Sequence, residues 1–292
     1  MTSAWHIGVI GGTGLYDAEI LEDAQEIPVN SAFGAPSGPI TTGTLSGVRF
    51  TFLARHGAGH RLPPDRINYR ANIDVLKRCG VTDVVSVSAI GSLREEIVPG
   101  DFVIVDQVID CTRGRERSFF GEGLAAHVSL AEPVCGRLSR MLHDAAAGAG
   151  AKVHPTGCYV AIEGPQFSTR AESRLYRSWG ADVIGMTAMP EARLAREAEL
   201  PYAVLAMVTD FDCWRDGAEQ VEVAKILAIL QENTSKAKAA LEALAEALPA
   251  EREPSPIDTA LDGAILTALG MRDPVLAARL GAVAGRVLGQ EN

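Results

Sequence analysis

The sequence contains no apolar run approaching the roughly 20 residues that a membrane-spanning helix needs. Residues 1–5 also lack the basic segment followed by an apolar segment that is typical of a signal peptide. The five cysteines are odd in number and widely spaced, and no Cys-x-x-Cys pair is present to bind zinc or to support redox chemistry. We therefore expect a cytoplasmic protein with buried free thiols.

Positive charge is also scarce in this chain. The 27 lysines and arginines are outnumbered by 37 aspartates and glutamates, which gives a formal net charge of −10. A general attraction to nucleic acid or to an anionic membrane is therefore not expected. Any anion that the protein binds must be held by a local site.

What the sequence does contain is enough apolar material for a large core. With 292 residues, 47% of them apolar, the chain suits one large α/β domain or one domain with an appendage. Short apolar runs rich in β-branched residues predict buried strands, and helical patterns separate several of them. The predicted strands cover residues 5–10, 48–53, 84–87, 102–108, 159–162, 183–184 and 202–208, and the predicted helices 68–79, 137–147, 171–179 and 191–198. This alternation predicts a single α/β domain with a central mixed, largely parallel sheet flanked by helices.

The C-terminal third predicts one long helix followed by a tail. Apolar residues repeat at helical spacing over residues 221–248, so we expect a helix that lays its apolar stripe on the sheet. Residues 249–256 carry three prolines and three charges, which is typical of a linker. We therefore predict a main domain over residues 1–248, a linker over 249–256 and a short helical tail over 257–292.

Polar and glycine-rich clusters directly follow five of the predicted strands. Open α/β sheets bind their ligands at this position, beyond the carboxyl ends of the strands. The clusters are Gly11-Gly12-Thr13-Gly14, Arg55-His56-Gly57, Ser88-Ala89-Ile90-Gly91-Ser92, Gly185-Met186-Thr187 and Thr209-Asp210-Phe211-Asp212.

The first cluster suits an anion such as phosphate, because its turn presents backbone N–H groups together with the Thr13 hydroxyl. Glycine-rich turns at this place often serve only close packing of helix and sheet. A Rossmann-type NAD(P)-dependent oxidoreductase is an alternative of another class. It fits less well, because Asp17 stands where the third glycine of that fingerprint belongs.

Charged side chains in the other clusters each allow two interpretations. Arg55 ends a buried strand, so it meets either a bound anion or an internal carboxylate. His56 is either an anion ligand or a structural histidine. Asp210 and Asp212 point the same way if the strand stays extended, and they suit a helix cap or the polar edge of a base. No further histidines or acids accompany them, so we expect no metal.

Two further residues near the clusters have competing structural roles. Phe167 follows a strand on a turn and is either an anchor into the core, which its chemistry alone favours, or a platform for stacking. Met186 is core filler by default, although Gly185 and Thr187 beside it leave room for a ligand to approach.

Taken together and in order, these segments resemble the trimeric purine nucleoside phosphorylase family, most closely its 5'-methylthioadenosine phosphorylase branch. The resemblance covers about residues 7–248. Besides the first two clusters it includes Gly91-Ser92-Leu93-Arg94-Glu95-Glu96, Ile162-Glu163-Gly164-Pro165, Ala171-Glu172-Ser173, Trp179-Gly180-Ala181-Asp182-Val183-Ile184 and Thr209-Asp210-Phe211-Asp212-Cys213-Trp214.

The resemblance implies a homotrimer that uses inorganic phosphate as co-substrate and needs no cofactor. It implies cleavage of 5'-methylthioadenosine to adenine and 5-methylthioribose 1-phosphate, a step of purine and methionine salvage. The implied phosphate site is Thr13, Arg55, His56, Ser88, Ala89 and Thr187. The implied nucleoside site is Phe167 against the purine, Met186 behind the ribose, Asp210 and Asp212 at N7 and the 6-amino group, and Val223, Ile226 and a neighbouring subunit's His127 around the methylthio group.

The two acids also bear on the choice of substrate and on the chemistry. A carboxylate complements the donor of a 6-amino purine, whereas a 6-oxo purine would place two acceptors together. In the 6-oxo branch of the family that these segments resemble, asparagine stands at the position of Asp210 and glutamate at the position of Ser168. This chain has neither. A phosphorylase for 6-oxo nucleosides or methylthioinosine is therefore the weaker alternative. Phosphate would be the nucleophile, and Asp210 would protonate the leaving base as general acid.

Overall fold

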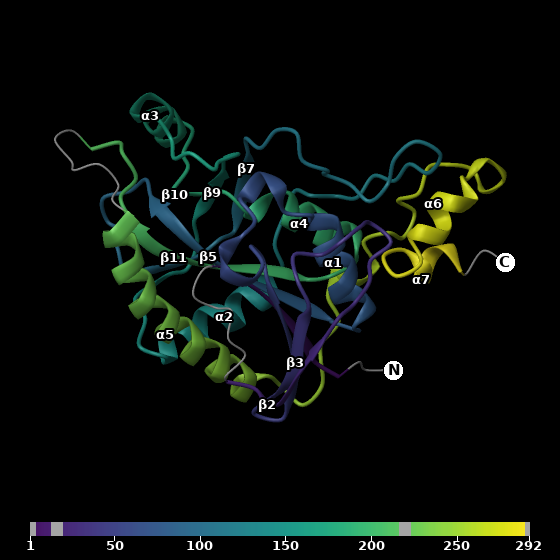
Figure 1. Ribbon diagram of the computed structural model, residues 1–292, viewed down its shortest axis with the longest axis horizontal. Coiled ribbons are helices and arrows are strands. Elements are labelled where there is room, and N and C mark those ends of the chain that lie inside the picture. The colour runs from purple at the N-terminus through teal and green to yellow at the C-terminus, as the bar shows by residue number, and fades with distance from the viewer. Residues whose placement is uncertain (1–3, 13–19, 216–222, 290–292) are drawn as a thin grey trace.

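A mixed sheet forms the centre of the computed structural model, which describes residues 4–12, 20–215 and 223–289, with only the backbone over residues 223–228 (Figure 1). In these residues the sheet has eleven strands. They are β1 (His6–Gly11), β2 (Glu22–Ile27), β3 (Ile40–Leu45), β4 (Val48–Ala54), β5 (Asp83–Ser92), β6 (Phe102–Ile104), β7 (Gln107–Asp110), β8 (Val153–His154), β9 (Cys158–Ala161), β10 (Val183–Gly185) and β11 (Tyr202–Asp210).

Strand β5 is the branch point of the sheet. β1 pairs with β4 and with β5 in parallel, and β5 pairs in parallel with β11 on its other side. β10 joins the far end of β5 in antiparallel fashion, with Ile184 opposite Gly91. The carboxyl ends of β1, β4, β5 and β11 therefore meet at one edge of the sheet, and the β10 segment comes up against that edge.

Helices cover both faces of the sheet. Residues of α1 and α4 share one buried cluster, and residues of α2 and α5 share another on the opposite face (Figure 1). The helices are α1 (Tyr69–Arg78), α2 (Gly136–Gly148), α3 (Arg170–Ser178), α4 (Ala188–Glu197), α5 (Val223–Ala247), α6 (Pro274–Arg279) and α7 (Gly285–Leu288), with short 3₁₀ turns at Ala58–His60, Pro64–Arg66, Pro256–Thr259 and Leu269–Met271. None of the helices among the described residues is both long enough and apolar enough to cross a membrane.

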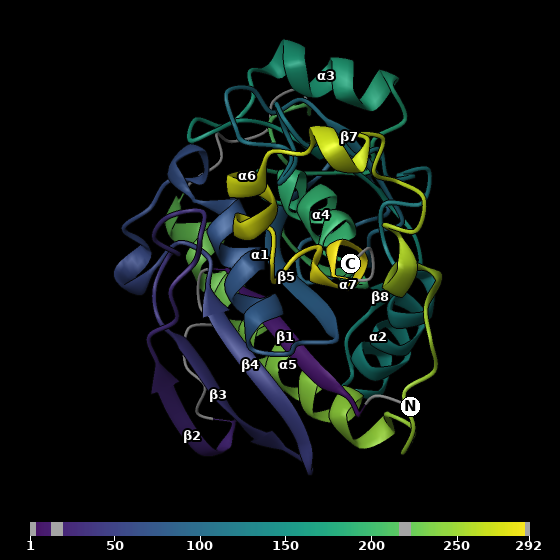
Figure 2. The same ribbon diagram turned by 90° about the vertical axis from the view of Figure 1, so that its right-hand side faces the viewer.

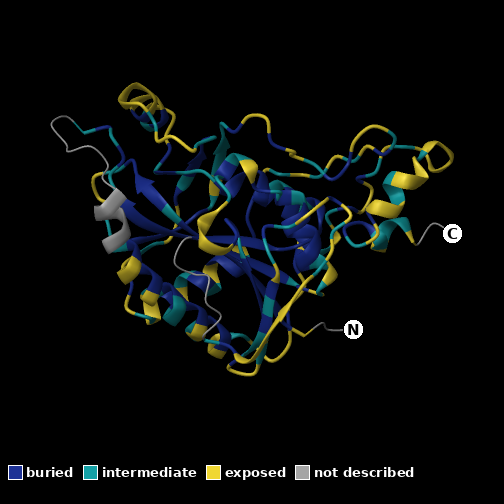
Figure 3. Ribbon diagram, viewed as in Figure 1, coloured by how far each residue is buried: buried dark blue, intermediate teal, exposed yellow. Residues whose placement is uncertain are grey.

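The long helix α5 lies on the sheet as its periodicity predicts. Leu241 and Leu244 are fully buried, in one cluster with Ile7 and Leu205 of the central strands. Glu242 lies on the opposite side of the helix and is exposed. Figure 3 shows the same division, with buried residues along the sheet and exposed residues on the outer sides of the helices.

The predicted strand over residues 102–108 is in fact two strands. β6 pairs with β11 and β8, whereas β7 pairs with β9 in the other branch of the sheet. The chain changes branch at Asp106, whose carboxylate accepts the Gly157 N–H at 3.0 Å. β2, β3 and β8 were not predicted. All six residues of β2 are exposed on an edge strand, so it lacks the apolar alternation of a half-buried strand.

Residues beyond α5 pack back onto the main body of the protein. Leu261 and Leu280 are buried in the cluster that includes α1 and α4, and α6 and α7 lie next to these helices (Figure 2). Arg252 forms ion pairs with Asp83 at the start of β5 and with Asp258. The division of the chain into main domain, linker and tail stays a prediction.

Truncating the α5 stripe should destabilise the whole protein. Leu241→Ala leaves a cavity between α5 and the sheet, so the free energy of unfolding should fall by about 2 to 5 kcal/mol. The matched control is Glu242→Ala on the exposed side of the same turn, which should change it by about 0.5 kcal/mol or less. Urea denaturation followed by circular dichroism measures both, and equal stabilities for the two variants would contradict the packing described.

Candidate active site

The structure brings most of the predicted site residues into one pocket. The cavity has a volume of about 480 Å³ and lies at the sheet edge where β1, β4, β5 and β11 end. The predicted residues that line it are Arg55, His56, Ser88, Ala89, Phe167, Met186, Thr187, Asp210 and Asp212.

Four predicted residues are not placed in this pocket. Thr13 lies outside the described residues, as do the side chains of Val223 and Ile226 at the start of α5. His127 is exposed and does not line the pocket, and its backbone N–H donates to the Ala264 carbonyl at 2.9 Å.

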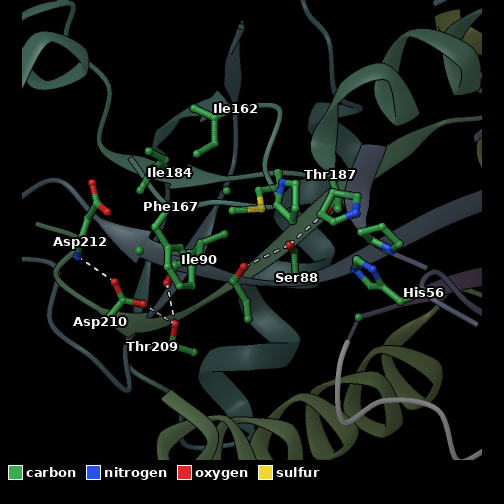
Figure 4. Close-up of a pocket in the computed structure, with 18 of the residues that line it drawn as sticks. His56, Ser88, Ile90, Ile162, Phe167, Ile184, Thr187, Thr209, Asp210 and Asp212 are labelled. Atoms are coloured by element: carbon green, nitrogen blue, oxygen red, sulfur yellow. Dashed lines mark hydrogen bonds between the residues drawn. The ribbon is translucent and has the colours of Figure 1, made fainter. Parts of the chain in front are cut away.

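The pocket has two chemically different ends. Figure 4 shows Asp210 and Asp212 at one end and His56 at the other, with Ser88 and Thr187 between them. The acids and the candidate anion ligands therefore face a shared space from opposite sides. A ligand of several rings and groups can contact both ends at once.

Arg55 is held in place by a buried carboxylate, which is one of the two interpretations that the sequence allows. Its side chain is 1% exposed, and Nε and Nη2 donate to the Glu191 carboxylate at 2.8 and 3.1 Å. Nη1 donates to the Val87 carbonyl at 3.1 Å. A guanidinium Nη1 carries two N–H groups, so one donor is left at this atom, which lies beside Gly12 in the pocket wall. The ion pair and an anion contact are thus compatible.

Glu191 on α4 is the residue that fixes this arginine, and the sequence analysis missed it. Its side chain is 1% exposed and also accepts hydrogen bonds from Ser86 Oγ at 2.9 Å and from the Tyr202 hydroxyl at 2.8 Å. Burial lowers the pKa of Arg55, but the adjacent Glu191 carboxylate raises it by more, so the arginine stays charged. A glutamate within the otherwise apolar stretch of residues 188–192 is the signal that could have identified it.

His56 is held by the loop that follows it. Its Nδ1 lies 2.8 Å from the Leu62 carbonyl oxygen, and the Leu62 N–H donates back to the His56 carbonyl at 2.9 Å. The ring of His60 stacks on it with 4.1 Å between ring centroids and an angle of 9° between the planes. Burial, and next the charge of Arg55, lower the pKa of His56 to about 4, so its ring is neutral at neutral pH.

Hydroxyl groups form the wall between the two ends. Ser88 Oγ and Thr187 Oγ1 lie 3.4 Å apart, and the backbone N–H of Thr187 donates to the Tyr159 hydroxyl at 3.3 Å. A Cβ at Gly185 would lie only 2.0 Å from that hydroxyl oxygen, so only glycine allows this approach. The buried tyrosine therefore positions the segment that carries Thr187.

The two acids are brought together by a turn rather than by extended strand. β11 ends at Asp210, and Asp212 has a φ of 50°, in the left-handed region. The backbone N–H of Asp212 donates to Asp210 Oδ1 at 2.7 Å. The strand does not stay extended to Asp212, so the condition set for a common direction of the two side chains is not met. The Asp210 side chain binds the backbone two residues on and turns the chain.

Burial shifts the pKa of both acids upward. Burial raises the pKa of Asp210, although the Thr209 hydroxyl and the Asp212 N–H work against it. Burial raises the pKa of Asp212 as well; the Ser173 hydroxyl works against this shift and the Asp210 carboxyl adds to it. Asp212 Oδ2 and Ser168 Oγ are buried and make no hydrogen bond within the described residues. Buried polar atoms are rarely left unpaired, so this end of the pocket is suited to a polar ligand.

Phe167 and Met186 lie at the pocket as well, and Arg115 ties their segments together. Phe167 is 53% exposed, so the interpretation as a core anchor is wrong. Arg115 is buried and donates to the carbonyls of Glu163 at 2.5 Å and of Met186 at 2.7 Å. No feature of the sequence marked Arg115, because its partners are mostly backbone carbonyls and lie far from it in the chain. No cluster of His, Cys, Asp and Glu suited to a metal ion occurs in the part of the chain that the structure describes.

Removing the negative charge of Glu191 should leave Arg55 buried without its partner. Glu191→Gln should therefore lower the free energy of unfolding by about 3 to 5 kcal/mol, measured by urea denaturation. Tyr202→Phe is the matched control, because it removes one hydrogen bond to Glu191 without removing charge and should cost about 1 kcal/mol. The ion pair would be unimportant to the fold if Glu191→Gln were as stable as the control.

Comparison with known proteins agrees with this geometry. Residues 6–246 match the family model described as the phosphorylase superfamily. The S-methyl-5'-thioadenosine phosphorylase of Cereibacter sphaeroides is 56% identical over 97% of this chain and 98% of its own length. The protein of that name from Rhodospirillum rubrum is 52% identical over 97% of both chains.

Comparison with solved structures also finds phosphorylases. A methylthioadenosine phosphorylase from an antarctic soil metagenomic library has a TM-score of 0.91 at 44% identity, covering 96% of this chain and 99% of its own. The Schistosoma mansoni methylthioadenosine phosphorylase in complex with adenine has a TM-score of 0.81 at 34% identity, covering 96% and 98%. None of these relatives supports the oxidoreductase alternative. The chain belongs to the phosphorylase superfamily and, within it, to the S-methyl-5'-thioadenosine phosphorylase family.

Proposed function

We propose that this protein uses inorganic phosphate to cleave the N-glycosidic bond of 5'-methylthioadenosine, releasing adenine and 5-methylthioribose 1-phosphate. The observation that carries the proposal is the pocket with anion ligands at one end and two buried acids of raised pKa at the other. The names of the relatives agree with it. Phosphate is the co-substrate, and we propose no cofactor.

The acidic end suits a 6-amino purine. Asp212 Oδ2 needs a hydrogen-bond donor, and the amino group of adenine supplies one. A 6-oxo purine would instead place its oxygen against this acceptor, which is why the alternative of a 6-oxo nucleoside is weaker. Phe167 is available to stack on the purine, and Met186 lies where it can pack behind the ribose.

The reaction needs no nucleophile from the protein. An unprotonated oxygen of hydrogen phosphate attacks the anomeric carbon of the ribose as the bond from that carbon to N9 breaks. The bond electrons pass to the purine, and the proton of Asp210 goes to N7, so neutral adenine leaves and Asp210 becomes a carboxylate. Arg55, His56, Ser88 and Thr187 contribute by orienting the phosphate, which makes the attack effectively intramolecular.

A neighbouring subunit completes the pocket in this proposal. The exposed His127 lies outside its own chain's pocket, which is consistent with a role in the pocket of a second copy. In the proposed homotrimer it joins Val223 and Ile226 around the methylthio group, whose burial is favourable whereas a 5'-hydroxyl would lose water there. We also propose a cytoplasmic location.

Comparison of substrates tests the proposed function directly. With phosphate present, adenine release should be fastest from 5'-methylthioadenosine, slower from adenosine, and slower again from inosine by about 100-fold or more in kcat/KM. Without phosphate no base should be released. Chromatography of the products measures all three reactions. Preferred cleavage of inosine would establish the 6-oxo alternative instead, and nucleoside binding without base release would mean a non-catalytic binding protein.

Replacing the proposed general acid should slow the chemistry and leave phosphate binding intact. Asp210→Asn should lower kcat by about 100-fold or more with little change in phosphate affinity. In the wild type kcat should fall as pH rises through the raised pKa of Asp210, because the protonated form is the active one, and this dependence should vanish in the variant. Asp144→Asn is the control, because the Asp144 side chain is exposed on the outer side of α2. An unchanged kcat in Asp210→Asn would remove the acid role.

A further inference from the structure

The tautomer of His56 is fixed by the backbone. A carbonyl oxygen only accepts hydrogen bonds, so Nδ1, which lies 2.8 Å from the Leu62 carbonyl, carries the ring proton. The reciprocal bond from the Leu62 N–H to the His56 carbonyl keeps the two residues together. In the neutral ring Nε2 is then an acceptor, and it has no hydrogen-bond partner among the described residues.

The surroundings of His56 keep the ring neutral. Burial, and then the charge of Arg55, lower its pKa to about 4, and the stacked His60 has a lowered pKa too. A charge on both stacked rings would bring two like charges within 4.1 Å. Glu191, the acid bound to Arg55, has its carboxylate engaged by that arginine. Nε2 therefore stays an acceptor at neutral and mildly alkaline pH.

We propose that His56 makes the pocket selective for oxyanions that carry a proton: Nε2 accepts a hydrogen bond from the protonated oxygen of hydrogen phosphate and disfavours a fully deprotonated anion such as sulfate. This inference rests on the proposed function, since it assigns a role within the phosphate end of the same pocket. It gives His56 the part of a specificity-determining residue.

The other groups at this end have the complementary polarity. Arg55 retains one N–H donor at Nη1. The contacts of Ser88 Oγ with the Ala89 carbonyl and with Thr187 Oγ1 are both long, at 3.4 Å, so these hydroxyls can turn to donate to a ligand. Hydrogen phosphate has one O–H for the acceptor at His56 and bare oxygens for these donors. Sulfate has bare oxygens alone, so it would place a lone pair against the lone pair of Nε2. The protonated oxygen, which is the poorer nucleophile, is thereby directed to His56, away from the attacking position.

Binding measurements on the full-length protein test the selectivity. At mildly alkaline pH, where phosphate is mostly the singly protonated dianion, the Kd of sulfate should exceed that of phosphate by about tenfold or more. Sulfate needs a protonated His56, so its affinity should fall about tenfold per pH unit above the pKa of that ring. Calorimetry in buffers of different ionisation enthalpy should show uptake of one proton with sulfate and almost none with phosphate.

Two variants separate the acceptor from a general effect of the ring. His56→Phe keeps a flat ring for the stack on His60 and removes both the acceptor and the site of proton uptake. Phosphate should therefore bind about tenfold more weakly, and sulfate binding should lose its proton uptake and its dependence on pH. His56→Gln presents either an amide oxygen or an amide N–H, so the ratio of the two Kd values should approach one. His60→Phe is the matched control, which keeps Nε2 of His56 and should keep the discrimination.

The outcomes distinguish this inference from the proposed function. It is overturned if the wild type binds sulfate as tightly as phosphate without proton uptake, or if His56→Phe weakens both anions equally. The wild-type calorimetry decides the question even if a variant fails to fold. Cleavage of 5'-methylthioadenosine without discrimination would defeat the selectivity alone. Discrimination without cleavage would defeat the proposed function and leave the selectivity supported.

Discussion

The buried ion pair between Arg55 and Glu191 is the interaction on which the site depends. It joins the end of β4 to α4, and through Ser86 and Tyr202 it also reaches β5 and β11. Two charges removed from water are tolerable only when their hydrogen-bonding capacity is nearly used, and here one N–H of Arg55 is left over at the pocket. The same pair places a fixed positive charge beside His56 and so contributes to keeping that ring neutral.

Burial shifts the pKa values at the two ends of the pocket in opposite directions. It disfavours the charged form of any titratable group, so it lowers the pKa of His56 and raises those of Asp210 and Asp212. Both shifts are toward the uncharged form, so they weaken the attraction that opposite charges would exert across the cavity. A polar ligand with an anion at one end and a basic nitrogen at the other fits this arrangement.

Much of the fold and of the pocket could be predicted from the sequence. The physical reasons for this also explain which residues the prediction missed. Buried strands such as β1 and β11 are apolar throughout, and parallel strands end at one edge, so the convergence of Arg55 and Asp210 was predictable. The family resemblance supplied the roles of the individual residues. Glu191 and Arg115 were missed because their partners are distant in the chain or are backbone atoms. The turn at Asp212 was missed because a side chain, not the strand pattern, determines it.

The end of β11 also allows Asp210 to change its protonation state without a movement of the backbone. Thr209 Oγ1 lies 2.8 Å from Asp210 Oδ2 and 3.1 Å from the Ile90 carbonyl, and a hydroxyl has one proton to donate. When Asp210 is protonated, the hydroxyl donates to the carbonyl and leaves the acid proton for a ligand. When Asp210 is ionised, rotation of the same hydroxyl supplies a donor to the carboxylate. Because the irregular pairing of β11 with β5 between Val208 and Asp210 places Thr209 between these two acceptors, the structure can stabilise the carboxyl group in either protonation state.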